Sequence, residues 1–196
     1  TWSTDGLINE YLNPCEAIHK GKRIEVLPLE GYERFTIDGT EYEAFNTSGG
    51  VGALCDMLEG KVENLDYKTV RYPGHQEILK ILIEDLGLGK RPDLMKEIFE
   101  KSLPITSQDV IVIFADAIGT RDGELCEENF IRKVHGTAIG GRNWSAIQIT
   151  TSAGLCAVMD MVLTGKLAGK GYIRQEQVSL DDFLANRFGR YFSLED

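Results

Sequence analysis

The fold of this chain is set by the stretch Tyr32-Glu33-Arg34-Phe35-Thr36-Ile37-Asp38-Gly39-Thr40-Glu41-Tyr42-Glu43-Ala44-Phe45. Asp38-Gly39 is a strong signal for a two-residue hairpin turn, because both central positions of that turn need a backbone conformation that Asp and Gly tolerate. Phe35 and Ile37 fall on one face of the first strand. The stretch therefore predicts an antiparallel hairpin that pairs residues 32–37 with residues 40–45.

Further elements are expected on both sides of this hairpin. A Pro73-Gly74 pair begins a helix with one apolar face that ends at Gly87. The other expected elements up to residue 72 are a helix over 6–11 capped by Asp5, a short turn over 15–20, a strand over 22–29, a turn over 46–50, a helix over 51–58 and a strand over 66–72.

The second half of the chain predicts a second hairpin and several helices. Residues 109–117 form a β-branched run typical of a buried strand, and residues 125–138 are expected to pair with it across a turn at Gly123. Helices are expected over 93–103, 144–163 and 179–192, with Ser179 as the N-cap of the last.

Strands thus come in consecutive pairs, while helices gather elsewhere. This pattern predicts an α+β fold in which a mixed, mostly antiparallel sheet is covered by helices on one face. The length of 196 residues suits one domain. Residues 1–196 are therefore assigned to a single domain.

Composition excludes several functions. The net charge of −10 disfavours nucleic acid as a partner, because such binding requires neutralisation of phosphates. No apolar run approaches about 20 residues, so no membrane span is expected. The four cysteines are dispersed and predict reduced, buried thiols in a cytoplasmic protein without a metal site.

A nucleotide-binding half is not encoded in this sequence. Such a half needs a strand, a G-x-G-x-x-G turn and a helix in succession. Gly136 with Gly140-Gly141 has the wrong spacing, and Gly49-Gly50 with Gly52 precedes only a short helix. If the protein uses a nicotinamide cofactor, the Rossmann domain that binds it is therefore expected outside these residues.

Three segments carry side chains suited to chemistry. The first, residues 5–11, includes Asn9, Glu10 and Tyr11, which could hold an ammonium and an α-carboxylate. Helix capping and a solvated face explain the same residues, and that interpretation is favoured when the segment is taken alone.

The second segment, residues 44–50, ends a strand with small donors and glycines. If Thr47, Ser48, Gly49 and Gly50 open a helix, their free N–H groups favour a bound carboxylate. A plain strand-to-helix turn capped by Thr47 or Ser48 fits equally well.

The third segment, residues 68–75, joins Arg71, Tyr72 and His75. Arg71 offers a planar fork for a carboxylate. His75 falls in the first turn of a helix, where the positive end of the helix dipole disfavours imidazolium. A neutral imidazole there could take a proton from a substrate amine. The alternative is an exposed histidine and an arginine in an ion pair.

Together, the segments Asp5-Gly6-Leu7-Ile8-Asn9-Glu10-Tyr11, Glu43-Ala44-Phe45-Asn46-Thr47-Ser48-Gly49-Gly50 and Lys68-Thr69-Val70-Arg71-Tyr72-Pro73-Gly74-His75 resemble the C-terminal domain of saccharopine dehydrogenases, in particular the lysine dehydrogenase-like branch. The stretch Trp144-Ser145-Ala146-Ile147-Gln148-Ile149-Thr150-Thr151-Ser152-Ala153-Gly154 resembles the same branch. The resemblance extends from residue 2 to about residue 192.

The resemblance implies a substrate and dimerisation domain joined to the enzyme's own N-terminal Rossmann domain. Such enzymes oxidise a C–N bond of a lysine-derived amino acid, saccharopine or lysine, with NAD or NADP. The isolated domain is then expected to be inactive and to form a homodimer through its sheet. A carboxyspermidine-type dehydrogenase and a non-catalytic dimerisation or binding module are the alternatives.

The same resemblance implies residue roles. Arg71 and the turn of Thr47, Ser48, Gly49 and Gly50 are expected to bind the substrate carboxylate, with Asn9, Tyr11 and Tyr72 completing the substrate site. His75, or else Glu10, is expected to transfer the proton.

Overall fold

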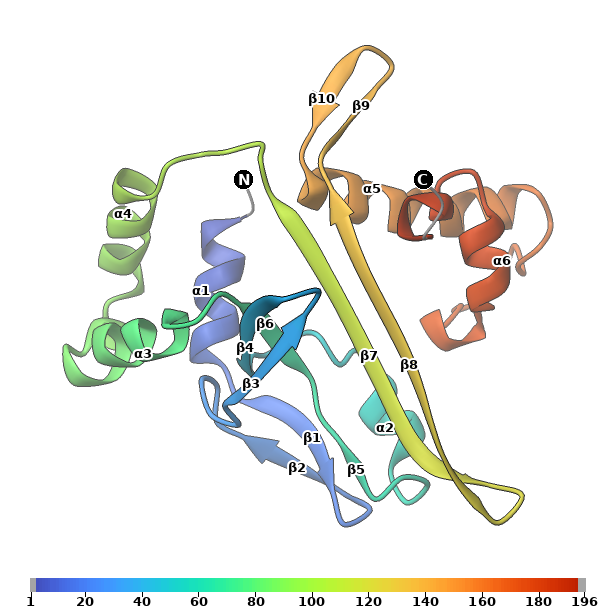
Figure 1. Cartoon of the computed structure of the whole chain (residues 1–196), viewed down its shortest axis with the longest axis horizontal. Helices are drawn as coiled ribbons and strands as arrows, with labels where there is room; N and C mark the ends of the chain where they lie inside the picture. Colours follow the sequence, from blue (N-terminus) through green and yellow to red (C-terminus); the bar gives the residue numbers. More distant parts are fainter. Residues whose placement is uncertain (1–2, 194–196) are drawn as a thin grey trace. The chain divides into compact units, whose positions relative to one another are not determined.

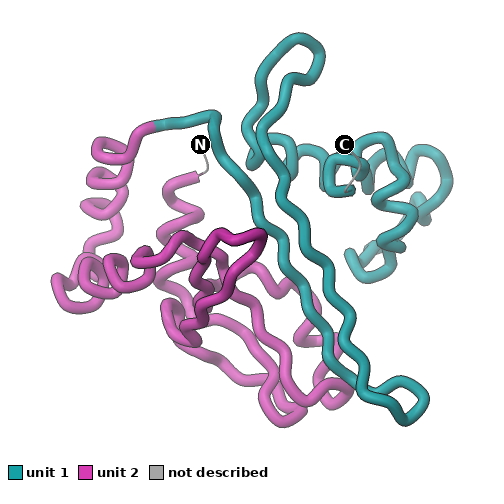
Figure 2. Tube along the Cα trace, in the orientation of Figure 1, with its two compact units in different colours: residues 1, 105–196 teal, residues 2–104 magenta. Residues whose placement is uncertain are grey.

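The computed structural model describes residues 3–193, and the chain divides into two compact units. Residues 2–104 form one unit, and residues 105–196 belong to the other (Figure 2). Compactness does not decide whether two units work as one domain, so the assignment of residues 1–196 to a single domain stays a prediction.

The unit of residues 2–104 contains two three-stranded antiparallel sheets, ordered β2-β1-β5 and β3-β4-β6, together with short helices (Figure 1). Its elements are α1 (Thr4–Leu12), β1 (Cys15–His19), β2 (Lys22–Val26), β3 (Glu33–Ile37), β4 (Thr40–Asn46), α2 (Leu54–Leu58), β5 (Asn64–Leu65), β6 (Lys68–Arg71), α3 (His75–Lys80), a π-helical turn (Ile81–Asp85), a 3₁₀ turn (Leu88–Lys90) and α4 (Pro92–Ser102).

The hairpin predicted around Asp38-Gly39 is confirmed. Strand β3 pairs with β4 from Glu33 opposite Ala44 to Ile37 opposite Thr40. Asp38 and Gly39 have φ values of 50° and 75°, which is the pair of positive values that the tight hairpin turn requires.

Strand β4 is the centre of its sheet and separates two environments. Glu43 lies opposite Arg71 and Phe45 lies opposite Thr69 in β6, so these four side chains share one face. That face is covered by an apolar core of Ile8, Tyr11, Leu29, Phe45, Leu79, Ile83 and Met95, which come from α1, β4, α3, α4 and the segments beside them. A second, smaller core consists of Ile18, Val51 and Cys55.

The unit of residues 105–196 is built on a long two-stranded hairpin. Val110 to Arg121 of β7 pairs in register with His135 to Glu124 of β8, with the turn at Asp122-Gly123. Its elements are β7 (Val110–Arg121), β8 (Glu124–His135), β9 (Thr137–Ile139), β10 (Arg142–Trp144), α5 (Ala146–Leu163), a 3₁₀ turn (Gln175–Gln177), α6 (Leu180–Ala185) and a 3₁₀ turn (Gly189–Phe192). The expected second hairpin is therefore confirmed.

Helix α5 is held at its N-terminus by side-chain acceptors. The Ser145 hydroxyl accepts a hydrogen bond from the Gln148 N–H, and the Gln148 side chain accepts one from the Ser145 N–H. The Asp109 carboxylate accepts hydrogen bonds from the Ala146 and Ile147 N–H groups, at 2.6 and 3.0 Å. These bonds satisfy donors that the first helical turn leaves free.

Helix α5 is also long and apolar enough to cross a membrane, judged by length and composition alone. Within residues 3–193 it alone meets that criterion. A single helix of this kind is weak evidence, because core helices can have the same composition. The sequence-based expectation of no membrane span stays a prediction.

Several local expectations were wrong. Residues 15–20 are not a turn, because β1 (Cys15–His19) pairs along its length with β2 and buries Ile18. The last helix does not extend over 179–192, because α6 ends at Ala185 and Asn186 is extended, with its amide donating to Asp160 at 2.8 Å.

Other differences are smaller. Ser3, not Asp5, caps α1, since the Ser3 hydroxyl accepts from the Gly6 N–H at 3.2 Å. The fold is α+β as predicted, but the strands form several small antiparallel sheets rather than one. Cys15 and Cys55 are buried, whereas Cys126 and Cys156 are only half-buried.

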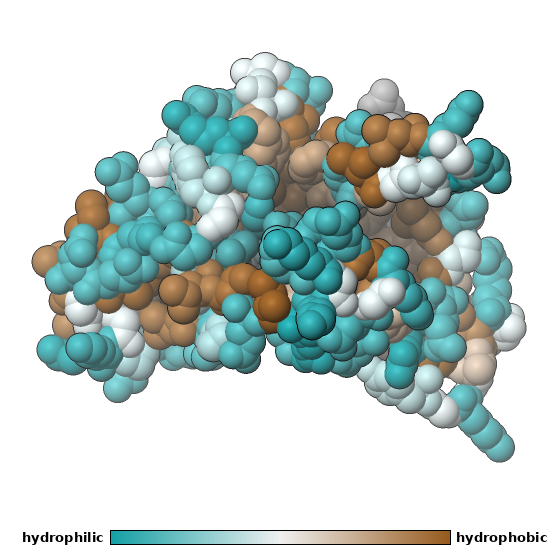
Figure 3. All heavy atoms as spheres, turned by 90° about the horizontal axis from the view of Figure 1, so that it is seen from below, coloured by the Kyte–Doolittle hydropathy of each residue, from teal (hydrophilic) through white to brown (hydrophobic). Residues whose placement is uncertain are grey.

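Apolar side chains also reach the surface in both units, and Figure 3 shows hydrophobic patches among hydrophilic side chains. Leu27 and Leu86 are exposed in the first unit, and Ile118 and Leu125 in the second. Single exposed apolar residues are common, whereas clusters of them are typical of interaction surfaces.

We expect Asp109→Ala to destabilise the unit that contains α5. The substitution leaves the Ala146 and Ile147 N–H groups without their acceptor, which typically costs about 1–2 kcal/mol. Urea unfolding followed by circular dichroism measures the change. Asp116→Ala removes the same charge from an exposed position of β7 and serves as the control. Equal stability of the two variants would contradict the capping role.

Candidate functional site

Tyr11, Phe45 and His75 converge at the N-terminus of α3. The Tyr11 hydroxyl lies 3.1 Å from His75 Nε2. The Phe45 ring lies 6.4 Å from the Tyr11 ring and 6.1 Å from the imidazole, measured between ring centroids. Three elements separated in sequence, α1, β4 and α3, therefore fix the imidazole.

Glu43 determines where α3 begins. Its carboxylate is buried, and it accepts hydrogen bonds from the N–H groups of Gly74 and Gln76, at 2.7 and 2.6 Å. The Tyr32 hydroxyl donates a third, weaker bond at 3.4 Å. Because the two N–H groups flank His75, the buried carboxylate holds the histidine in the first helical turn. Sequence analysis did not identify Glu43 as a site residue.

The turn after β4 lies against the C-terminal half of α1. The Ser48 N–H donates to the Glu10 carbonyl at 3.1 Å, and the Ser48 hydroxyl donates to the Asn9 carbonyl at 3.3 Å. Thr47 is buried, and within residues 3–193 its hydroxyl oxygen has no hydrogen-bond partner. The turn of Thr47 and Ser48 therefore lies against the backbone of Asn9 and Glu10.

The glycines of this turn have different roles. Gly49 has a φ of 87°, which a side chain disfavours. A Cβ atom at Gly50 would overlap the Tyr67 ring, so only glycine fits beneath that ring. Helix α2 begins at Leu54, so the N–H groups of Gly49 and Gly50 are not at a helix N-terminus. The physical basis for carboxylate binding by these two glycines is therefore absent.

Arg71 supplies the positive charge of the site. It shares a face of the sheet with Glu43, and its guanidinium donates to the Val70 carbonyl at 2.9 Å. Among the side chains of residues 3–193, no carboxylate forms an ion pair with it. The guanidinium therefore retains the capacity to bind a carboxylate from a ligand.

The surroundings keep the imidazole neutral. Burial, assisted by the Arg71 guanidinium, lowers the pKa of His75 to about 4, and the Glu43 carboxylate only partly opposes this. Burial raises the pKa of Glu10 and that of Tyr11, and Arg71 opposes both shifts. At neutral pH the site therefore combines a neutral imidazole, a neutral phenol and a cation, an arrangement suited to proton transfer beside a bound anion.

Two tyrosines differ from the sequence-based expectation. Tyr72 stacks on Tyr42 with ring centroids 5.6 Å apart, on the face of β4 opposite Phe45, so it is not brought beside His75. Tyr67, which was not predicted, lies over Gly50, and Glu10 and Arg71 both perturb its pKa, which burial raises. No local sequence pattern predicts that the Tyr67 ring packs over Gly50.

Acid is expected to weaken the fold through His75. The pKa of His75 lies at about 4 in the folded protein and at 6.5 for a free imidazole. Between these values the unfolded chain binds a proton that the folded chain excludes, so stability falls as the pH is lowered from 6.5 to 4. The loss is on the order of 2 kcal/mol.

Urea unfolding at several pH values measures this effect. His75→Gln should flatten the slope within that window, whereas His19→Gln, which alters an exposed imidazole, should not. Identical slopes for the wild type and His75→Gln would show that His75 titrates normally.

Comparisons with known proteins place this chain in a family. Residues 1–189 match the sequence model of the saccharopine dehydrogenase C-terminal domain. The fold resembles a solved structure of apo histidine-tagged saccharopine dehydrogenase (L-Glu forming) from Saccharomyces cerevisiae, with a TM-score of 0.64 and 15% identity, over 88% of this chain. The match covers 55% of that enzyme's chain, so this chain spans about half the length of its relative. The predicted family is confirmed: this chain belongs to the saccharopine dehydrogenase C-terminal domain family.

Proposed function

We propose that this chain is the substrate-binding portion of an NAD(P)-dependent oxidoreductase that acts on the C–N bond of saccharopine or lysine. The observation that carries the proposal is a neutral His75, held against Tyr11, beside an arginine without an ion pair among the described residues. Membership of the family supports the reaction class. A cytoplasmic location is part of the same proposal.

In this proposal Arg71 binds the substrate carboxylate. The Thr47 hydroxyl lies in the turn against Glu10 and retains an unused hydrogen-bonding capacity for the same ligand. Tyr11 orients the imidazole. His75 accepts the proton that the substrate amine loses as its C–N bond becomes a C=N bond. Glu10, whose pKa burial raises, is the second candidate for this proton.

The nicotinamide cofactor supplies the hydride acceptor for such a reaction. The residues of this chain do not form a binding site for that cofactor, because the sequence carries no G-x-G-x-x-G turn between a strand and a helix. Cofactor binding is therefore assigned to a Rossmann domain outside these residues. The isolated chain should bind substrate without turning it over.

A purely structural role for the site is less well supported. A pure binding module would not need several neighbouring groups with perturbed pKa values. Instead the guanidinium perturbs the pKa of His75 and also forms part of the surroundings of Glu10 and Tyr11. This concentration of perturbed groups is more typical of catalytic sites than of structural ones.

Variants of the complete, cofactor-binding protein test these roles. Arg71→Ala should raise KM for saccharopine or lysine at least about tenfold, since it removes a charge-assisted contact. His75→Gln should lower kcat by about 10²-fold with a smaller change in KM. Arg34→Ala, an exposed arginine of β3, is the control. Unchanged kinetics in both site variants would exclude this site from the reaction.

We also propose that the β7–β8 hairpin forms a homodimer interface. An isolated two-stranded hairpin is marginally stable in water, and Ile118 and Leu125 are exposed on this one. A second copy of the hairpin would cover them.

Sedimentation velocity should therefore give twice the chain mass of 21.8 kDa at about micromolar concentration. Ile118→Asp should shift the protein to monomer, and Leu27→Asp, at an exposed position of the other unit, should not. A monomer at every concentration would refute the interface.

A further inference from the structure

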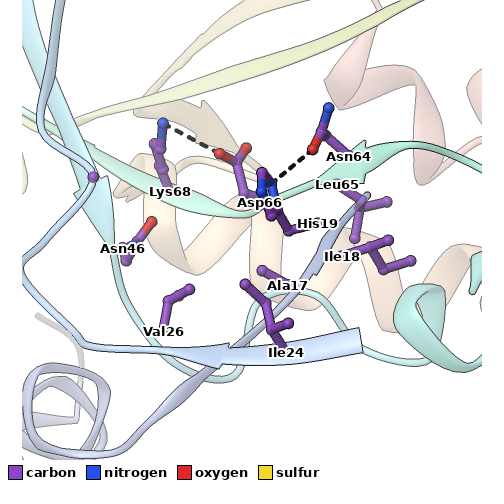
Figure 4. A pocket seen from close by; sticks show the side chains of 11 residues that line it. Ala17, Ile18, His19, Ile24, Val26, Asn46, Asn64, Leu65, Asp66 and Lys68 are labelled. Atoms are coloured by element: carbon purple, nitrogen blue, oxygen red, sulfur yellow. Dashed lines mark hydrogen bonds and ion pairs between the residues drawn. The ribbon is translucent and has the colours of Figure 1, made fainter. Parts of the chain in front are cut away.

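A cavity lies on the face of β4 opposite the candidate site. Its volume is about 320 Å³, and it is a half-open pocket lined by residues of the two three-stranded sheets of residues 2–104 (Figure 4). The alternation along β4 places Phe45 toward His75 and Asn46 toward this cavity. The cavity is therefore separate from the cluster of Tyr11, Arg71 and His75.

One wall of the cavity is apolar. Ala17 of β1 lies opposite Ile24 of β2, and Val26 lies two residues beyond Ile24, so the three side chains share one face of their sheet. Leu65 of β5 also borders the pocket, although it pairs with Ile18 and belongs to the other face of that sheet. The Ile24 side chain lines the pocket and is more than one-third exposed. These side chains leave space between the two sheets that is open to solvent.

The rest of the lining is polar and rich in acceptors, and it comes from both sheets. The ammonium of Lys68 is already held by Glu33 and by Asp66, the latter at 3.3 Å. His19 Nδ1 lies 3.1 Å from the Asn64 side-chain oxygen. These pairs engage most of the hydrogen-bond donors in this part of the pocket. The Asp66 carboxylate can accept further hydrogen bonds.

Asn46 provides the clearest unused acceptor. It is 6% exposed, and its side-chain N–H₂ donates to the Leu27 carbonyl at 3.4 Å. Among residues 3–193 no hydrogen bond reaches its side-chain oxygen, which Figure 4 shows directed into the cavity. This oxygen can therefore accept a hydrogen bond from water or from a ligand.

We propose that this cavity binds a protonated primary amine that carries an aliphatic chain. The ammonium group would donate to Asn46 and Asp66, and the chain would cover Ala17, Ile24 and Val26. A carboxylate or phosphate fits poorly, because Lys68 is already neutralised by two carboxylates. The net charge of −10 also favours a cation over an anion. A divalent metal fits poorly, because the described residues form no group of three His, Cys, Asp or Glu side chains that could hold one.

Amide chemical shifts of the ¹⁵N-labelled chain test the proposal. The experiment measures no activity, so its result does not depend on the proposed oxidoreductase function. Pentylamine is the probe, and 1-pentanol and pentanoate are its uncharged and anionic analogues. Pentylamine should shift the amides of Ala17, Asn46 and Lys68 with a Kd on the order of 1 mM. The two analogues should produce shifts at least about tenfold weaker at equal concentration.

Three variants locate the binding. Asp66→Asn should weaken pentylamine binding about tenfold. Val26→Phe should abolish it by filling the cavity, with a melting temperature measured to confirm folding. Glu25→Gln removes a carboxylate from the adjacent exposed position of β2 and should leave binding unchanged.

Two outcomes would overturn the proposal. Equal shifts with pentylamine, pentanol and pentanoate would show an unspecific apolar cavity. The absence of any shift, with each probe at a concentration of about twenty times the expected Kd, would show that water alone fills the space.

Discussion

The hydrogen bonds from the Gly74 and Gln76 N–H groups to the Glu43 carboxylate are the contact on which the rest of the first unit depends. A carboxylate this deeply buried is stable only when its charge is met by donors. The donors here are the free N–H groups of a helix start, whose dipole also favours an anion. The bond therefore joins a strand to a helix and fixes the residue between the two donors, His75.

Strand β4 gives this unit two different faces. Glu43 and Phe45 face α1 and α3, where the imidazole, the phenol and the guanidinium meet. Asn46 faces the other sheet and the cavity beneath it. A change in the register of β4 by one residue would exchange these faces, so the pairing of β3 with β4 at the Asp38-Gly39 turn sets the position of both sites.

Local signals were sufficient to predict the hairpins and most helices, because turn residues and apolar periodicity act over short distances. The placement of Tyr11 and His75 at one site came instead from the family resemblance, because their contact spans 64 residues. Local signals failed at β1, whose strand character comes from pairing with β2, and at Asn186, whose side chain binds Asp160 and ends α6. Glu43 and Tyr67 were missed for the same reason. A charged residue in a strand is usually solvated, and only the tertiary structure shows that Glu43 is buried beneath a helix end.

The sequence separation between Tyr11 and His75 has a kinetic consequence. Their contact closes a loop of 64 residues, whereas the β7–β8 hairpin closes around a two-residue turn. Loop closure of this length carries a larger entropic cost and slows folding. During synthesis α1 leaves the ribosome well before its partner. The hairpin can therefore form from local contacts at once, while the imidazole gains its environment only after the whole first unit has been made.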